Sequence, residues 1–551
     1  MTIFLCGFMG CGKTRLGRVL AQLLHLPLID LDDYIVQQEG RSIPEIFAEN
    51  GEPYFRAVEA QAVRTLRHQN AVISCGGGAM LNAESAAAAR ETGAVVLLDQ
   101  SFAVCYSRIK NDTNRPLVQR NTTGNDLSPA GQRLPCTCQL HCSGRQYTGR
   151  IGTACAGCTG TFRCYRGNQM KIYHAEIMTM TEKGIIPNGY VTIENGIITA
   201  VEAGDPTPEE GDLDAHGSRL LPGFIDAHTH LGIIEDGLDF EGDDCNEATD
   251  PFLPQLRALD GINPFDRCFA EARQAGITTV MISPGSANPC GGTMLAAKTF
   301  GKRIDDMSLG AIGMKFALGE NPKTVYRDRD ETPITRMATA ALIREGLYKA
   351  RRYLEEVNVA ENDPEESMPD YDAKCEALLP LLRKEIKAHF HCHRADDICT
   401  AMRIAEEFDL DYVIVHATEG HLIADILGTE QVPVIAGPIL CDRCKPEMRN
   451  LDIKSPAELH RCGVLTALCT DHPVIPIQHL PTTASLAVKG GLPYEAALEA
   501  ITCNAAKVLG LSDRIGAIAP GMDADLQLYG GDPLDLQQDP WYVCINGKPI
   551  H

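Results

Sequence analysis

Apolar runs and helical patterns alternate along the first hundred residues of the chain. Strand-like runs lie at Ile3–Cys6, Ala71–Cys75 and Val95–Leu98, and helical patterns lie at Arg15–Leu24 and Ala57–Arg67. This alternation predicts an α/β unit with a parallel sheet. A further helix start is predicted by Ser42-x-x-Glu45 with Pro44 between them, the pattern of a capping box.

A second pattern begins at Met170 and continues to the C-terminus. Short alternating runs flank Asn195-Gly196, a hairpin turn signal, and GAIAPGMDADLQLYGGDP and WYVCINGKPI near the other end also read as short strands. The two ends, 170–222 and 517–551, are therefore expected to build one small β-domain around a larger domain at 223–516.

Within 223–516, apolar runs repeatedly end in polar residues and are followed by helical stretches. These runs are Phe224–His230, Thr278–Ser283, Ala311–Glu320, Ala388–His393, Tyr412–His416 and Leu465–Asp471. Polar side chains at successive strand ends predict a (β/α)8 barrel with its site at that face. The last helix is predicted at Pro493–Leu509, closed by Gly510.

Length and charge narrow the function classes. A chain of 551 residues requires several domains, and a formal charge of −23 argues against nucleic acid or an anionic membrane as a partner. There is no 18-residue apolar stretch, and the N-terminus has a buried-strand pattern rather than that of a signal peptide. We expect a cytoplasmic protein whose 22 cysteines are mostly reduced thiols, some of them candidate metal ligands.

The first predicted strand runs directly into Gly7-x-x-x-x-Gly12-Lys13-Thr14, the pattern of a nucleotide phosphate loop. In such a loop, backbone N–H groups surround the phosphates, Lys13 reaches the β- and γ-phosphates, and Thr14 binds Mg²⁺. The pattern predicts nucleotide binding and leaves the second substrate open.

Further polar residues in the N-terminal unit suit phosphoryl transfer. Asp30 and Asp32 follow an apolar run, where one carboxylate can serve Mg²⁺ and the other a substrate hydroxyl. Arg56 follows GEPYF, Gly76-Gly77-Gly78 ends a strand where bare backbone can approach a ligand, and Arg115 lies in a candidate lid, NDTNRPLV.

Taken in order, GFMGCGKT, DLDD, GEPYFRAVE, CGGG and NRPLV resemble shikimate kinase. The resemblance implies that Gly10, Cys11, Gly12, Lys13, Thr14 and Arg15 bind ATP, that Thr14 and Asp30 serve Mg²⁺, and that Arg115 reaches ATP from the lid. It also implies that Asp32, Arg56 and Gly77 hold shikimate. Asp32 is the implied base for the 3-hydroxyl, and the Arg56 guanidinium would bind the substrate carboxylate.

The resemblance ends near residue 122, before the family's last third, so kinase turnover is in doubt.

The following segment, 123–169, has six Cys and five Arg but no Val, Lys, Glu or Met, and shows no periodicity. We interpret it as an unstructured or out-of-frame linker, which resequencing of the genomic DNA would test. The alternative is a zinc module formed by Cys136, Cys138, Cys142, Cys155, Cys158 and Cys164.

Candidate metal ligands follow several predicted strands of the C-terminal unit. His228 and His230 alternate on one strand and therefore face the same side, and His391, His416 and Asp471 end later strands. Imidazoles with a carboxylate suit Zn²⁺ or another divalent ion. Asp471 can then take a proton from a metal-activated water and pass it to a leaving nitrogen.

The segments PGFIDAHTH, HFHCHRADD, VIVHATEGH, ALCTDHPV and PGMDADL resemble metal-dependent amidohydrolases, imidazolonepropionase-like members most closely. The resemblance implies His228 and His230 on one metal, His391 and His416 on a second or shared position, and Asp471 as catalytic acid and base. A bridging ligand is also implied, with Glu320 as first candidate and Lys315 as the alternative, because some relatives use a carboxylated lysine. His393 and Arg394 are candidate substrate contacts, and Asp226 a support for the first strand.

Three function classes therefore stand. The first is a shikimate kinase joined to an amidohydrolase acting on a non-peptide C–N bond, using ATP, Mg²⁺ and one or two divalent metals. The second is an amidohydrolase carrying an inactive kinase remnant. The third is a non-catalytic nucleotide- or metal-binding regulator, which the complete metal constellation argues against. Shikimate, ATP and an amide or cyclic amide are the expected small-molecule partners, and a homo-oligomer would form through the barrel domain.

Overall fold

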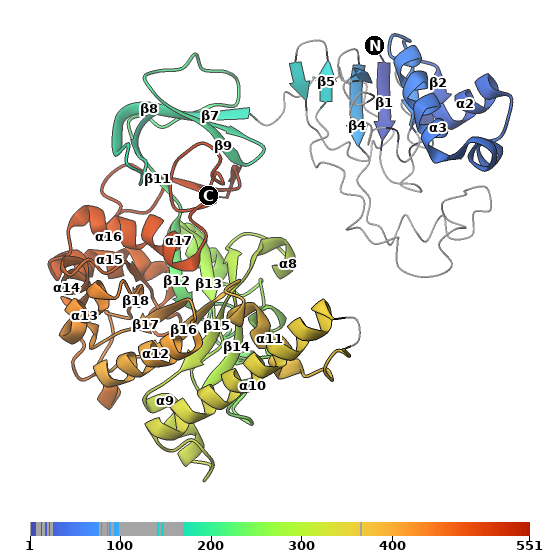
Figure 1. The fold of residues 1–551 in the computed structure, drawn as a ribbon. Helices are drawn as coiled ribbons and strands as arrows, with labels where there is room; N and C mark the ends of the chain where they lie inside the picture. Colours follow the sequence, from blue (N-terminus) through green and yellow to red (C-terminus); the bar gives the residue numbers. More distant parts are fainter. Residues whose placement is uncertain are drawn as a thin grey trace. The chain divides into compact units, whose positions relative to one another are not determined.

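The computed structural model describes residues 2–6, 13, 17–18, 21, 26–75, 79, 85, 88–89, 93–97, 140–142, 145–147, 169–363 and 366–550. The chain divides into two compact units, Met1–Asn168 and Gln169–His551 (Figure 1). Each unit is described by itself.

The N-terminal unit contains a four-stranded parallel sheet in the order β2-β3-β1-β4. Its strands are β1 (Thr2–Cys6), β2 (Leu28–Asp30), β3 (Val72–Ser74) and β4 (Gly93–Leu97), and its described helices are α2 (Leu31–Glu39) and α3 (Ile43–Leu66). The predicted parallel α/β sheet is confirmed. Most of the helix predicted at Arg15–Leu24 lies outside the described residues.

Helix α3 begins where the capping box predicted it. The Ser42 side chain and the N3 backbone interact, the Glu45 carboxylate accepts from the Ser42 N–H at 2.8 Å, and a proline lies in the first turn. The helix continues through the pattern predicted separately at Ala57–Arg67. It is kinked at Gly51, where φ is 77° and ψ is 174°, because glycine tolerates positive φ without steric penalty.

Two short strands lie in the segment that the sequence pattern left without structure. β5 (Leu140–Cys142) pairs antiparallel with β6 (Arg145–Tyr147), so these described residues form a small hairpin. Of the six cysteines weighed as zinc ligands, five (Cys136, Cys138, Cys155, Cys158 and Cys164) lie outside the described residues. The zinc alternative therefore stays untested.

The second unit opens and closes in one β-sheet. Its order is β22-β21-β20-β11-β7-β8-β9, with β10 paired to β7. The strands are β7 (Gln169–Met178), β8 (Ile185–Glu194), β9 (Ile197–Ala203), β10 (Leu213–Asp214), β11 (Arg219–Pro222), β20 (Leu526–Tyr529), β21 (Tyr542–Ile545) and β22 (Lys548–Pro549). The hairpin predicted at Asn195-Gly196 joins β8 to β9, with both turn residues at positive φ.

The larger part of this unit is an eight-stranded sheet in sequence order (Figure 1). Its strands are β12 (Phe224–Thr229), β13 (Ile277–Ile282), β14 (Cys290–Lys298), β15 (Ser308–Ala317), β16 (Lys387–Cys392), β17 (Tyr412–His416), β18 (Val434–Ala436) and β19 (Thr466–Leu468). The sheet is barrel-like, but β14 runs antiparallel to both its neighbours. The sequence pattern missed β14 and β18 and did not anticipate the reversed strand.

Helices surround this sheet. They are α7 (Cys268–Gln274), α8 (Ile304–Met307), α9 (Glu320–Arg327), α10 (Arg336–Asn362), α11 (Ala373–Leu382), α12 (Ala395–Phe408), α13 (Ala424–Thr429), α14 (Ser455–Arg461), α15 (Leu480–Lys489), α16 (Tyr494–Ala500) and α17 (Cys503–Leu509). The single helix predicted at Pro493–Leu509 is wrong. It breaks at Thr502, where φ is −136° and ψ is −102°, although Gly510 closes α17 as predicted. No described helix is long and apolar enough to cross a membrane.

Alternation along the strands separates apolar core from polar site. Phe390 and Cys392 of β16 and Phe316 of β15 belong to the apolar cluster shared with the surrounding helices. Because successive strand residues face opposite sides, His391 and Lys315 face the inside of the barrel. This arrangement places buried polar side chains where strand ends converge.

A buried ion cluster joins the barrel to the small β-domain. Lys298, at the end of β14, pairs with Asp525 and, at 3.1 Å, with Asp523, which precede β20. Arg514 also contacts Asp523 at 3.1 Å. Lys298, Asp523 and Asp525 are each at most 7% exposed, so each charge depends on its partners for stabilisation.

We expect Lys298→Met to lower the free energy of unfolding by about 3–5 kcal/mol, because it leaves the buried Asp525 carboxylate without its cation and Asp523 with Arg514 alone. The chain has a single tryptophan, Trp541, so intrinsic tryptophan fluorescence during urea unfolding reports on the C-terminal unit alone. Lys302→Met, at an exposed position, is the matched control and should stay within about 0.5 kcal/mol of wild type. Equal midpoints for the two variants would contradict the prediction.

Candidate functional site

The seam between the first and last barrel strands positions the core of the site. The Asp471 N–H donates to the His228 carbonyl at 3.1 Å, and the His230 N–H donates to the His472 carbonyl at 2.8 Å. The buried Asp226 carboxylate accepts from the Thr470 hydroxyl at 2.6 Å and from the Thr470 N–H at 3.2 Å. These bonds hold His228-x-His230 against Asp471, and they give Asp226 the supporting role expected from the sequence.

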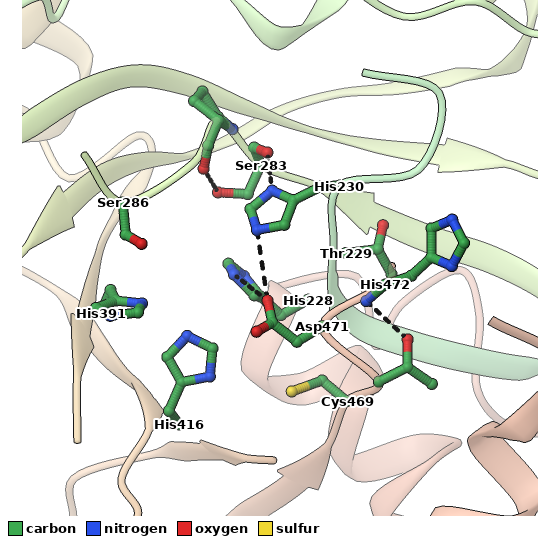
Figure 2. Close-up of polar contacts among 12 residues, drawn as sticks. His228, Thr229, His230, Ser283, Ser286, His391, His416, Cys469, Asp471 and His472 are labelled. Carbon is green, nitrogen blue, oxygen red and sulfur yellow. Dashed lines mark hydrogen bonds and ion pairs between the residues drawn. The ribbon is translucent and has the colours of Figure 1, made fainter. Parts of the chain in front are cut away.

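One group of candidate ligands lies on this seam (Figure 2). His228, His230 and Asp471 offer ligand atoms within 4.8 Å of one another. The Asp471 Oδ1 lies 3.6 Å from His228 Nε2 and 3.4 Å from His230 Nε2. Because His230 Nδ1 lies 2.7 Å from the Ser283 carbonyl, which can only accept, Nδ1 carries a proton and Nε2 is the nitrogen that faces Asp471.

A second group lies on β16 and β17 and directly after β16. His391, His393 and His416 offer ligand atoms within 4.8 Å of one another. His416 Nδ1 lies 2.8 Å from the Gly437 carbonyl, which again leaves Nε2 as the free nitrogen. His393, expected from the sequence as a substrate contact, thus lies among the candidate ligands, with its Nδ1 2.7 Å from the Thr418 hydroxyl.

The two groups adjoin each other. The ring centroids of His228 and His416 are 5.3 Å apart and meet edge to face. Lys315 Nζ lies 3.2 Å from His228 Nε2, and the Lys315 side chain is fully buried. Its charge also lowers the pKa of His391 and His416, after the larger effect of burial. Lys315 therefore lies between the two groups, where a bridging ligand belongs.

The structure places Glu320, the first candidate for the bridge, elsewhere. Its carboxylate accepts from the Glu447 N–H at 3.3 Å, and among the described residues it belongs to neither group of converging ligand atoms. The physical reason is its position: Glu320 begins α9 beyond the end of β15, whereas Lys315 is within β15. The geometry favours the alternative, Lys315.

The electrostatics of the site suit metal ligands. Burial lowers the pKa of His228, His391 and His393 well below the ordinary value and that of His416 to about 4, so these rings are neutral. Burial alone would raise the pKa of Asp471, but His416, His230 and Lys315 hold it below its usual range. The pKa of His230 is the exception: burial lowers it, but Cys245 and Asp471 outweigh burial and raise it to about 10. Four neutral imidazoles beside an ionised carboxylate fit the donor set that Zn²⁺ prefers.

Two further observations fit a cation-binding site. His416 Nε2 and Asp471 Oδ1 are buried without a hydrogen-bond partner, and such atoms are costly unless something binds them. His416 and Asp471 also have positive φ, at 75° and 55°. Left-handed backbone at non-glycine residues is strained and concentrates at functional positions.

In the N-terminal unit the structure describes Lys13, Asp30, Asp32 and Arg56. Asp30 caps α2, accepting from the Asp32 N–H at 3.2 Å, and Arg56 pairs with the buried Glu59 at 2.8 Å. Burial raises the pKa of the Cys75 thiol, and the charges of Glu59, Lys13, Asp32 and Asp30 also act on it. The four charges therefore lie near the end of β3.

The remaining nucleotide and substrate residues expected in this unit lie outside the described residues. They are Gly10, Cys11, Gly12, Thr14, Arg15, Gly77 and Arg115. Their roles stay predictions.

Several site residues gave no signal in the sequence. The carbonyls of Ser283 and Gly437 fix the imidazole tautomers, but any residue type supplies a carbonyl. Asn321 lies beside His391 and accepts from Lys445. Asn321 directly follows the predicted run Ala311–Glu320 but was not singled out, and Lys445 follows a strand that the pattern missed.

Comparisons with known proteins agree with both halves of the chain. A family model described as shikimate kinase matches residues 9–145, and one described as amidohydrolase family matches 219–548. A shikimate kinase of Geobacter metallireducens is 42% identical over 127 residues, which cover 23% of this chain and 71% of that protein. The first match runs beyond residue 122, where the resemblance was expected to end.

The amidohydrolase half has relatives in sequence and in structure. Amidohydrolase tasK of Hapsidospora irregularis is 32% identical over 392 residues, covering 65% of this chain but only 39% of its own length. A solved amidohydrolase from Thermotoga maritima is 40% identical, covers 69% of this chain and 99% of that one, and superposes with a TM-score of 0.67. The chain belongs to the amidohydrolase family and, through its N-terminal part, to the shikimate kinase family; both domains are present, the kinase domain in partial form.

If Lys315 bridges the two groups, Lys315→Met should weaken metal binding at least about tenfold, the effect found even for residues that only orient ligands. Glu320→Gln is the matched comparison and should leave binding unchanged, because its carboxylate contacts the Glu447 backbone instead. Metal content per chain, measured by elemental analysis after dialysis against buffered zinc, checks both variants. Loss of metal in Glu320→Gln with retention in Lys315→Met would reverse the assignment.

Proposed function

We propose that the C-terminal unit is a metal-dependent hydrolase of a non-peptide C–N bond in an amide or cyclic amide. The observation that carries the proposal is the convergence of five imidazoles, Asp471 and Lys315 at one end of the barrel, with His416 Nε2 and Asp471 Oδ1 unpartnered and buried. The amidohydrolase relatives support the reaction class and leave the substrate open.

His228, His230 and Asp471 would hold one divalent metal, and His391 and His416 a second or shared position, with Lys315 between them. Zn²⁺ suits this donor set best. A metal bound there supplies a water of lowered pKa and polarises the substrate carbonyl. The chain's own contribution is orientation: the Ser283 and Gly437 carbonyls fix the ring tautomers, and the β12–β19 seam fixes Asp471.

Asp471 has the position of the proton-transfer group. Its Oδ1 lies 3.6 Å from His228 Nε2 and 3.4 Å from His230 Nε2, and its lowered pKa keeps it ionised and able to accept a proton. In the proposed reaction it takes the proton from the attacking water and delivers it to the leaving nitrogen as the C–N bond breaks.

We expect Asp471→Asn to lower the rate of amide hydrolysis by about 10²–10⁴-fold, because the amide cannot accept the proton. The measurement is amine or ammonia release from a panel of amides, cyclic amides and imides by zinc-loaded full-length protein. Metal content is determined on the same samples, so that loss of the proton acceptor is separated from loss of metal. An Asp471→Asn protein that keeps both metal and full turnover would contradict the assignment.

For the N-terminal unit, we propose a shikimate kinase-type site for ATP, Mg²⁺ and shikimate, whose reaction is phosphorylation of the shikimate 3-hydroxyl. Lys13 would contact the phosphates, Asp32 the 3-hydroxyl and Arg56 the carboxylate. The support is the family match together with the electrostatic effect of Lys13, Asp30 and Asp32 on the Cys75 thiol. The match covers only part of the kinase domain, so we assign the chain's catalytic turnover to the C-terminal unit.

We accordingly expect no shikimate-dependent ADP release above that of Lys13→Ala, because the partial domain lacks the family's last third. A coupled assay on mass-verified full-length protein with a folded, metal-loaded C-terminal unit measures this. Release in the wild type that Lys13→Ala abolishes would show instead that the shortened kinase turns over.

A further inference from the structure

Three loops bring polar side chains together beside His391. Asn321 Nδ2 donates to the Ser286 hydroxyl at 2.7 Å and lies 3.4 Å from His391 Nε2. Lys445 Nζ donates to Asn321 Oδ1 at 3.0 Å. Ser286 follows β13, Asn321 lies at the start of α9 after β15, and Lys445 follows β18, so the contact unites separate loops of the barrel.

The orientation of the Asn321 amide is determined by these partners. A lysine ammonium can only donate, so the oxygen of the amide must face Lys445. The nitrogen then faces Ser286 and His391. The amide is thus fixed next to the candidate metal ligand His391, and it fixes the Lys445 ammonium in turn. Figure 2 shows Ser286 on the same side of the site as His391.

Reciprocal backbone contacts hold the two loops that carry Asn321 and Lys445. The Glu447 carboxylate accepts from the Glu320 N–H at 2.8 Å, and the Glu320 carboxylate accepts from the Glu447 N–H at 3.3 Å. Glu320 precedes Asn321, and Glu447 lies two residues after Lys445. The same contacts that keep Glu320 away from the metal ligands therefore position the Asn321 amide beside His391 and the Lys445 ammonium on that amide.

The charge of Lys445 is only partly compensated. Its hydrogen bond goes to a neutral amide, and the nearest carboxylate oxygen, Glu447 Oε1, is 4.0 Å away. The Lys445 side chain is 36% exposed, whereas Glu447 is buried. Lys445 also contributes to the lowered pKa of His391, His393 and His416, after the larger effect of burial. An ammonium with N–H groups to spare thus faces the space beside the histidines.

We propose that Lys445, oriented by Asn321, binds a carboxylate of the substrate, so that the hydrolase acts on amides or cyclic amides that carry a carboxylate. This inference rests on the proposed hydrolase function. A partly exposed cation on a fixed hydrogen-bonded support, beside the reacting centre, is the arrangement by which a pocket orients an anionic group. A salt bridge there would fix the C–N bond relative to Asp471 without any part in the chemical step.

The competing explanation is that Lys445 serves only as a counterion for the buried Glu447. In that case its removal would disturb the Glu320–Glu447 contacts and impair all substrates alike. Recognition of a carboxylate predicts the opposite, a loss confined to substrates that carry one.

The test compares matched pairs of substrates on zinc-loaded full-length protein. Each pair consists of an N-acyl amino acid and its neutral C-terminal amide, or of hydantoin-5-acetic acid and its amide. For Lys445→Met we expect kcat/KM to fall about 10- to 100-fold for the acids, as for lost hydrogen bonds to charged groups, and to change less than about threefold for the amides. Lys445→Arg should restore most of the loss, and Lys489→Met, at an exposed lysine of α15, should match wild type.

Binding is measured in parallel by isothermal titration calorimetry, with the same acids and amides as probes and metal content as a check. If the substrate carboxylate bound the metal directly, that contribution would be the same in wild type and in every variant. It would therefore drop out when the variants are compared with wild type. Equal changes for acids and amides, or no change for either, in both turnover and binding would overturn the subsite. If no pair is hydrolysed but the binding preference depends on Lys445, the carboxylate subsite stands and the hydrolase proposal fails.

Discussion

The seam between β12 and the end of β19 is the constraint on which the active-site arrangement depends. Main-chain hydrogen bonds pair His228 and His230 with Asp471 and His472, and the buried Asp226 carboxylate holds Thr470 from both its hydroxyl and its N–H. The two strands are far apart in the chain, so their chemistry meets only when the barrel is complete. Binding of a metal by these side chains would therefore be coupled to folding of this unit, as is usual where ligands come from distant segments.

The interior of the barrel concentrates polar groups that would be costly without a cation. Burial keeps four of the five imidazoles neutral, neighbouring charges keep Asp471 ionised, and the backbone is strained at His416 and Asp471. The surrounding core stabilises this arrangement through apolar side chains that alternate with the polar ones on the same strands, such as Phe390 beside His391. Strain and unpaired groups at one place, within a well-packed unit, are the usual mark of a functional site.

The two units contribute unequal evidence about activity. The barrel unit brings its candidate ligands, proton acceptor and a polar mouth together in described residues, and a solved relative covers it almost completely. The kinase-like unit has the parallel sheet and several of the expected charges, but most of its phosphate loop lies outside the described residues. Each unit belongs to an enzyme family. Only the barrel unit shows a converging set of candidate catalytic side chains among the described residues, so we assign the proposed hydrolysis to it.

The sequence by itself determined both families, the parallel sheet, the capped start of α3, the β8–β9 turn and the identity of most candidate ligands. These features are local: a capping box, a two-residue turn or His-x-His at a strand end specifies its geometry through neighbouring residues. Tertiary structure alone decided the reversed strand β14, the break at Thr502, the preference for Lys315 over Glu320 and the meeting of Asn321 with Lys445. Each depends on which distant segments pack together, and only closure of the barrel sets those distances.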